Sequence, residues 1–312
     1  MPTEILDITL DFLPAESVVS FALTCRGLHA KYSVRNQILD SAARESLLLL
    51  LEKDAAALYY CYHCSSLHKW HPTSTTSRAS TAYKLKFHTA RLALHGRIRG
   101  PAHGPELEKL HMDHAVTLGS RNITIKESWA AKVIDGELFL RAVWNYHQGA
   151  GGAKTLGRWV EHDADRFICN HVKGSRLLEF PGAEGLDLSS VERLAGPVRS
   201  CPICYTDFQM EVRGDEWDES ESESEDDEEA QRGSGGWSIN VTKWVRLGAC
   251  ESPLDAHWQT LASQSAHGLE CEPRNSSCEA GEIRHRWVDG KQKPSAYQGR
   301  FVEAGCLQVP HY

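Results

Sequence analysis

The sequence predicts an α+β protein, in which a short helical segment precedes a larger region that combines helices with a small antiparallel sheet. Apolar residues recur at helical spacing over residues 1–60. Residues 84–165 change to segments that alternate between apolar and polar residues, as half-buried strands do. Two widely separated C-x-x-C pairs indicate a zinc ion that staples distant parts of the second region together.

The first 40 residues predict three short helices. An apolar face that includes Ile8 predicts the first helix, and Pro14 ends it because the residue before a proline avoids the helical region. The second helix should end near Leu23, with Ser17 as a candidate cap, and the third should begin near Leu28. Helices this short cannot bury all their apolar faces on one another, so another surface must cover the remainder.

The second region predicts helices first and strands later. A longer helix is expected over residues 41–60, with five leucines at its centre, and residues 84–95 could be a strand that passes into a short helix. Glycines and prolines mark a loop over residues 96–105. Strands are expected over residues 122–126, 130–134, 137–146 and 237–247. Asp135-Gly136 predicts a two-residue hairpin turn between two of them.

Most of the negative charge lies in one segment. Eleven acidic residues and no basic residue lie between Asp215 and Glu229, and removing them from the net charge of −8 leaves +3. Residues 214–236 are too polar to offset their ordering entropy by burial, so they predict an acidic disordered insertion between folded residues 41–213 and 237–312. Three serines in it are each followed by an acidic residue three positions later and are candidate phosphorylation sites: Ser220, Ser222 and Ser224.

Composition excludes several classes of partner. The nearly neutral remainder of the chain predicts no nucleic-acid partner, and no stretch approaches the ~20 apolar residues of a membrane helix. The ten cysteines are roughly 3% of the 312 residues, far below the ~8–10% of secreted disulfide scaffolds. No basic segment precedes an apolar one at the N-terminus, as it would in a signal peptide. We therefore expect a cytoplasmic or nuclear protein in a reducing compartment.

The cysteine pairs are Cys61-Tyr-His-Cys64 and Cys201-Pro-Ile-Cys204. Each pair can present two thiolates at the ~2.3 Å that zinc requires, and together they would complete a tetrahedral four-sulfur site. An alternative site combines one pair with Cys169 and His171, and a further alternative leaves the cysteines reduced in turns or in the core. A structural zinc contributes an apparent ~10–16 kcal/mol in finger peptides, which is enough to hold distant segments together.

Residues 1–30 resemble an F-box. The matching positions are Pro2, Glu4, Ile5, Leu6, Leu10, Phe12, Leu13, Val18, Phe21, Leu23, Cys25 and Arg26. Three positions depart from the family pattern, because Met1 stands where Leu is usual, Thr9 where Ile is usual, and Leu28 where Trp is common. The resemblance implies that residues 1–40 bind the Skp-family linker protein of a cullin–RING ubiquitin ligase. It assigns this contact to Pro2, Ile5, Leu6, Leu13, Val18, Phe21 and Leu23.

A looser likeness covers most of residues 1–260 and extends to the F-box-domain proteins abundant in filamentous fungi. It rests on the segments around the two cysteine pairs and on the hairpin at Asp135-Gly136. It implies a non-catalytic adaptor that recruits an unknown target protein through its C-terminal region. The alternative is a zinc-stabilised protein-interaction module that acts outside a ubiquitin ligase. We expect no enzyme, because the sequence has no G-x-S-x-G, H-E-x-x-H or G-x-G-x-x-G motif.

Overall fold

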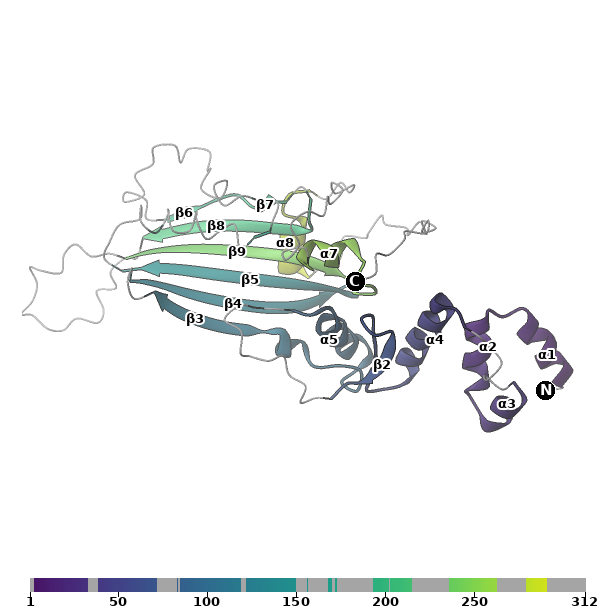
Figure 1. Cartoon of the computed structure of the whole chain (residues 1–312). Coiled ribbons are helices and arrows are strands. Elements are labelled where there is room, and N and C mark those ends of the chain that lie inside the picture. Colours follow the sequence, from purple (N-terminus) through teal and green to yellow (C-terminus); the bar gives the residue numbers. More distant parts are fainter. Residues whose placement is uncertain are drawn as a thin grey trace, which may run out of the picture.

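A computed structural model gives the α+β architecture, with short N-terminal helices followed by a large antiparallel sheet (Figure 1). It describes residues 3–32, 39–71, 83, 85–118, 122–149, 156, 168–169, 172, 193–201, 203–214, 236–262 and 279–290.

The three predicted N-terminal helices are confirmed as α1 (Thr3–Asp11), α2 (Ala15–Ala22) and α3 (Arg26–Lys31). The residue that caps α2 is Pro14 and not Ser17, and its extended ψ of 153° separates α1 from α2.

Cys25 caps α3, because its Sγ accepts a hydrogen bond from the amide of Leu28 at 3.4 Å. The Asp7 carboxylate in α1 accepts hydrogen bonds from Lys31 Nζ and Tyr32 Oη at 2.9 and 2.5 Å, which joins the first helix to the end of the third.

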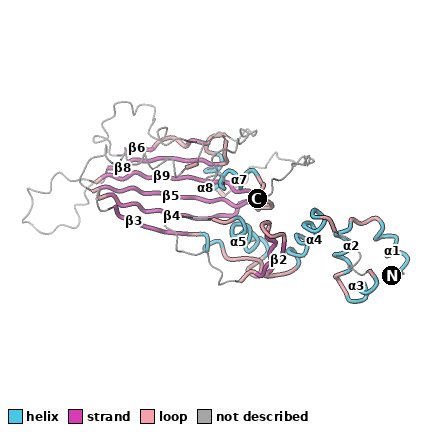
Figure 2. Tube along the Cα trace, viewed as in Figure 1, coloured by secondary structure: helices cyan, strands magenta, loops and turns pink. Residues whose placement is uncertain are grey.

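The helix predicted over residues 41–60 is too long. Helix α4 (Ser41–Asp54) begins where the Asp40 carboxylate accepts from the amide of Ala43 at 2.7 Å, and it ends six residues earlier than expected. Residues Leu58–Cys61 form strand β1 instead, paired with β2 (Ser66–Lys69) in a hairpin. A helix cannot continue through Ala57, because its φ of 64° is incompatible with a right-handed helix. Figure 2 shows this hairpin between α4 and the large sheet.

Within the described part of the chain, the large sheet has seven strands rather than the few that the sequence predicts. Its order is β3 (Met112–Leu118), β4 (Ile123–Ile134), β5 (Glu137–Gln148), β9 (Trp237–Gly248), β8 (Thr206–Gly214) and β6 (Arg193–Ala195), with β7 (Arg199–Ser200) also paired to β8. All these pairs are antiparallel. The predicted segments 122–126 and 130–134 are parts of one strand, β4. The turn at Asp135-Gly136 is confirmed, and both residues have the positive φ, 55° and 77°, that a two-residue hairpin turn requires.

Helices pack against both faces of the large sheet. On one face, α5 (Phe87–Arg99) and α7 (Ala256–Ala262) contribute Leu94 and Trp258 to the main core, which also contains Leu140 and Trp144 of β5. On the other face, α8 (Glu282–Asp289) packs Ile283 against Phe139 and Trp244. Alternate residues of β5 therefore serve opposite faces, as strand geometry requires.

Helix α5 continues through Gly96, where the sequence predicts a loop. The chain that follows the helix, including the short 3-10 turn η2 (Leu107–Leu110), folds back along it. A Cβ atom on Gly104 would lie only 1.8 Å from the carbonyl oxygen of Leu92, and one on Gly96 would lie 2.7 Å from that of Gly104. The glycines therefore permit a close approach of loop and helix. Residues 85 and 86, just before α5, form no strand.

The acidic insertion departs from one end of the sheet. Gly214 at the end of β8 and Trp237 at the start of β9 are register partners, so the chain leaves and re-enters the sheet at neighbouring positions. Residues 215–235, with Ser220, Ser222 and Ser224, lie outside the described residues. Among the described helices, none combines the length and the apolar character that a membrane span requires.

Candidate metal centre

The two C-x-x-C pairs lie in two separate groups of metal-ligand side chains. One group contains Cys61, Cys64 and His68, and the other contains Cys169, Cys201 and Cys204. Within each group the ligand atoms lie within 4.8 Å of one another.

The expected four-sulfur site of Cys61, Cys64, Cys201 and Cys204 is therefore replaced by two sets of three ligands. The physical reason is the topology. The first pair belongs to the β1–β2 hairpin, which forms a sheet of its own, and the second belongs to the turn between β7 and β8 of the large sheet. Of the alternative ligands, Cys169 joins the second pair, and His171 lies outside the described residues.

The turn between β7 and β8 places backbone amide donors next to the second cysteine pair. The Sγ atom of Cys201 accepts hydrogen bonds from the amides of Ile203 and Cys204, both at 3.4 Å. Two backbone hydrogen bonds of 2.9 Å close the turn. The amide of Cys201 donates to the carbonyl of Thr206, and the amide of Thr206 donates to the carbonyl of Cys204. Amide donors stabilise a negative sulfur, so the local backbone favours the thiolate that metals bind.

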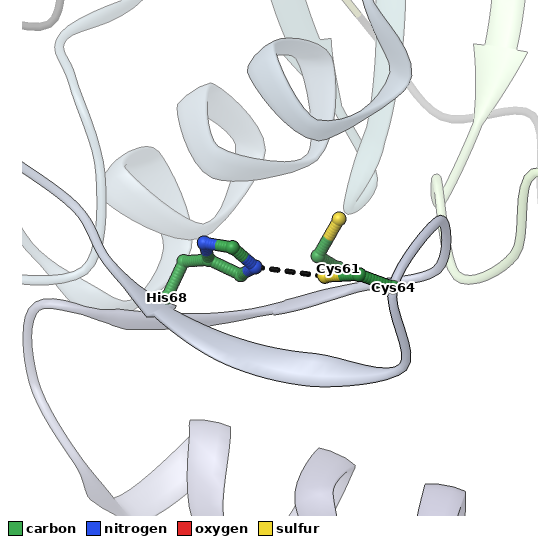
Figure 3. A group of neighbouring side chains, drawn as sticks. All are labelled: Cys61, Cys64 and His68. Atoms are coloured by element: carbon green, nitrogen blue, oxygen red, sulfur yellow. Dashed lines mark hydrogen bonds between the residues drawn. The ribbon is translucent and has the colours of Figure 1, made fainter.

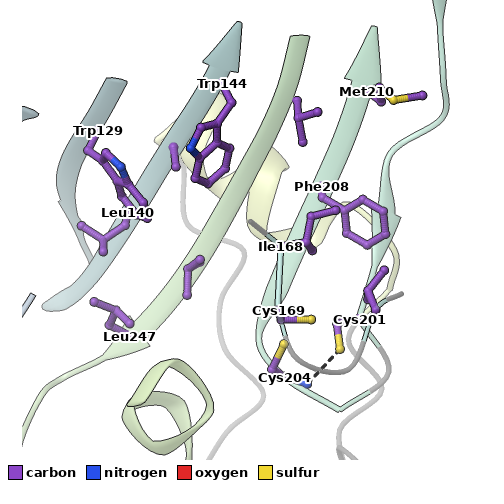
Figure 4. Packing of buried hydrophobic residues seen from close by; sticks show 14 of the residues in the cluster. Trp129, Leu140, Trp144, Ile168, Cys169, Cys201, Cys204, Phe208, Met210 and Leu247 are labelled. Carbon is purple, nitrogen blue, oxygen red and sulfur yellow. Dashed lines mark hydrogen bonds between the residues drawn. The ribbon is translucent and has the colours of Figure 1, made fainter. Parts of the chain in front are cut away.

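Cys169 brings the third sulfur from a distant part of the sequence. All three cysteines are buried in the main core, next to Ile168 and Phe208, and their sulfur atoms point toward one another (Figure 4). Hydrogen bonds with Cys169 and Cys204 lower the pKa of Cys201, whereas contacts with Cys169 and Cys201 raise the pKa of Cys204. Among the three thiols, these contacts favour the thiolate form at Cys201.

A buried lysine supplies positive charge near this cysteine group. Lys243 of β9 is only 2% exposed, and its Nζ lies 5.1 and 5.2 Å from the ring centroids of Trp129 and Trp144. Burial lowers the pKa of Lys243 to about 8, and the neighbouring Cys169 and Cys204 partly oppose this effect. Three thiolates around a divalent ion carry a net charge of −1, which a lysine cation at this position would balance.

The donor set fits zinc or a similar thiophilic ion. In a tetrahedral site with Zn–S bonds of about 2.3 Å, sulfur atoms are separated by about 3.8 Å. The sulfur atoms of Cys169, Cys201 and Cys204 all lie within 4.8 Å of one another, which is compatible with this separation. The amide donors and Lys243 provide the surrounding hydrogen bonds and charge that orient such ligands. The buried cluster of Cys169, Cys201 and Cys204 can therefore bind a metal ion such as zinc.

The sequence contained a signal for Lys243 that the sequence analysis missed. Residues Ile239, Val241, Lys243 and Val245 alternate along β9, and all four are buried. A lysine in phase with inward-facing apolar residues indicates a buried cation.

The residues expected to bind a linker protein differ in exposure. Ile5, Leu13 and Leu23 are exposed and Leu6 and Phe21 are half-buried, whereas Pro2 lies outside the described residues. Val18 is only 8% exposed and lies in α2, which contacts α4. Ile8 and Phe12, which were not assigned to the contact, are 61% and 84% exposed.

Comparison of the chain with protein-family models, with curated proteins and with solved structures gave no match in any of the three.

Proposed function

We propose that this chain is a non-catalytic adaptor of a Skp–cullin–F-box ubiquitin ligase, and that its N-terminal helices bind the Skp-family linker protein. The observation that carries the proposal is a set of exposed large apolar residues in α1 and in the turns that follow α1 and α2: Ile5, Ile8, Phe12, Leu13 and Leu23. We call these five residues the docking surface.

The size and concentration of the docking surface support a protein partner. Phe12 and Ile8 expose 84% and 61% of their area within a segment of about 30 residues. Full burial of one such side chain contributes about 1.5–3 kcal/mol, so covering the whole surface is strongly favourable. Neighbouring exposed apolar residues of this kind mark interaction sites, whereas isolated ones are common.

The arrangement of the helices also suits an adaptor. Helices α1 to α3 lie at one end of the molecule, beyond α4 and the β1–β2 hairpin (Figure 1). A linker protein bound there would leave the large sheet free to hold a target. Such an adaptor accelerates transfer of ubiquitin by raising the effective concentration of the target near the ligase, without chemistry of its own.

The proposed role of the metal is structural. A zinc ion bound by Cys169, Cys201 and Cys204 would fix a distant segment of the chain to the β7–β8 turn, inside the core of the target-binding region. Burial of all three ligands supports this role, because a catalytic zinc needs an open position that substrate can reach.

The test is co-purification of the full chain with its Skp-family linker protein. Stable association is expected for the natural sequence, and loss of association for a double variant, Ile8→Asp with Leu13→Asp. The matched control, Ile98→Asp with Val288→Asp, places the same charges at residues that are 55% and 60% exposed outside these helices, and it should still associate. If the natural chain fails to associate, or the docking variant binds as well as the control, the proposal is wrong. A chain that binds zinc without binding the linker would instead be an interaction module outside the ligase.

A further inference from the structure

The β1–β2 hairpin brings two thiols and an imidazole to one side of a short ribbon. In its register Cys61 pairs with Ser66 and Tyr59 pairs with His68. Cross-strand partners, and residues two apart on a strand, share a face, so Cys61, Ser66 and His68 lie on the same face of the hairpin. The turn from β1 to β2 includes Ser65 with a left-handed φ of 49°. Cys64 Sγ lies 2.8 Å from His68 Nε2 (Figure 3) and 2.9 Å from Ser66 Oγ.

These atoms form a ligand set for a thiophilic metal. The ligand atoms of Cys61, Cys64 and His68 all lie within 4.8 Å of one another, and thiolate and imidazole are the ligands that zinc prefers in proteins. The ring of His68 also stacks on Tyr59, with 5.6 Å between the ring centroids, which holds the imidazole in place.

We propose that Cys61, Cys64 and His68 bind a second zinc ion, independent of the ion at Cys169, Cys201 and Cys204. The fourth position of a tetrahedral ion here faces outward, because Cys64 and His68 are exposed, and it would be occupied by water or another donor. The chain then carries two zinc ions, one on an exposed hairpin and one in the core.

The position of the hairpin gives this second ion a structural consequence. The Tyr62 hydroxyl, inside the turn, donates a hydrogen bond to the carbonyl of Glu251, and the Tyr62 ring meets Phe87 of α5 edge-on at 5.6 Å. Phe87 in turn meets Trp258 of α7 at 5.1 Å. The hairpin also contacts α4. A zinc ion that joins the end of β1 to β2 would therefore stiffen the connection between the N-terminal helices and the sheet.

The stoichiometry of bound zinc tests the proposal. Elemental analysis of the full natural chain, purified without chelators, should give about two zinc ions per chain. The exposed substitution His68→Asn combined with Cys64→Ser should reduce this to about one, and Cys201→Ser should likewise remove one. The matched control, His29→Asn with Cys25→Ser, changes the same residue types at exposed positions of the N-terminal helices and should keep both ions.

Two outcomes would overturn the proposal. One is a hairpin variant that retains the zinc content of the natural chain, and the other is a natural chain that binds a single ion. Titration with Co²⁺ provides a second measurement that does not depend on variants that fold poorly. The natural chain should show thiolate-to-cobalt absorption that saturates at two equivalents, and the chain carrying only His68→Asn should keep the tetrahedral spectrum for one equivalent. Saturation of the natural chain at one equivalent would also contradict the second site.

Discussion

Glu52 of α4 and Arg91 of α5 form an ion pair inside the protein, with 2.6 Å between Oε2 and Nη2 and side chains that are 2% and 9% exposed. The guanidinium of Arg91 also lies over the ring of Tyr62, 5.4 Å from its centroid. Burial raises the pKa of Glu52, and the charge of Arg91 opposes this rise. One buried contact therefore joins the helix that follows the N-terminal segment, the β1–β2 hairpin and the helix on the large sheet.

Removing one partner of this pair should destabilise the protein strongly. Arg91→Met would leave the Glu52 carboxylate buried without its cation, which typically costs about 3–5 kcal/mol of the free energy of unfolding. The double variant with Glu52→Gln should recover part of that loss. Urea denaturation measures both. Arg213→Met is the control, because the Arg213 side chain in its 2.9 Å pair with Glu211 is 47% exposed, so its loss should cost less than about 1 kcal/mol.

His95 should make stability depend on pH. Burial, together with the positive charges of Arg91 and Arg99, lowers the pKa of this imidazole to about 3 from an ordinary value of 6.5. Between these two values the unfolded chain binds more protons than the folded protein, so stability falls as the pH falls across this window. Melting temperatures measured from pH 7 to pH 5 should therefore decline less for His95→Asn than for the natural chain. His111→Asn, at an exposed position, should reproduce the natural profile, and an unchanged slope in His95→Asn would contradict this assignment.

Phe12 should contribute more binding energy than the other residues of the docking surface, because its side chain is the most exposed of the five. Phe12→Ser is expected to weaken binding to the Skp-family linker protein by about 10- to 100-fold, since a large aromatic anchor at an interface contributes about 1.5–3 kcal/mol. The same change should alter the free energy of unfolding by less than about 0.5 kcal/mol, because the ring has few partners within the chain. Calorimetric titration and urea denaturation separate these effects. Ile98→Ser, at an exposed position of α5, should leave affinity unchanged.

Lys243 should help to retain the metal in the core. Lys243→Met removes the cation that balances three thiolates, and a charge contribution of about 1–2 kcal/mol predicts zinc affinity that is lower by about tenfold. Competition with a chromophoric chelator measures this change. Lys126→Met, at an exposed position of strand β4, provides the control. Equal affinities for the two variants would show that Lys243 has no electrostatic role at the site.

Local features of the sequence were sufficient to predict much of the fold. Pro14 marks the break between the first two helices, and Asp135-Gly136 marks the hairpin, because both act through backbone angles of the residues concerned. The end of α4 was not predictable in this way. Leu58 and Tyr59 continue an apolar stretch that is equally compatible with a helix. They form a strand because the chain pairs with residues 66–69 and because the amide of Ala57 donates a hydrogen bond to the carbonyl of Ala102.

The residue types that can hold a metal are evident from the sequence, whereas their combination into sites depends on the fold. Two C-x-x-C pairs have the spacing of zinc ligands, and four thiolates suggest one site. The hairpin register, however, gives Cys61 and Cys64 a local partner in His68, whereas Cys201 and Cys204 receive Cys169 from a distant segment. Local spacing fixes the distance between two ligands of a pair. The third ligand depends on which strands meet in space, and that is set by sheet pairing and by burial across the whole core.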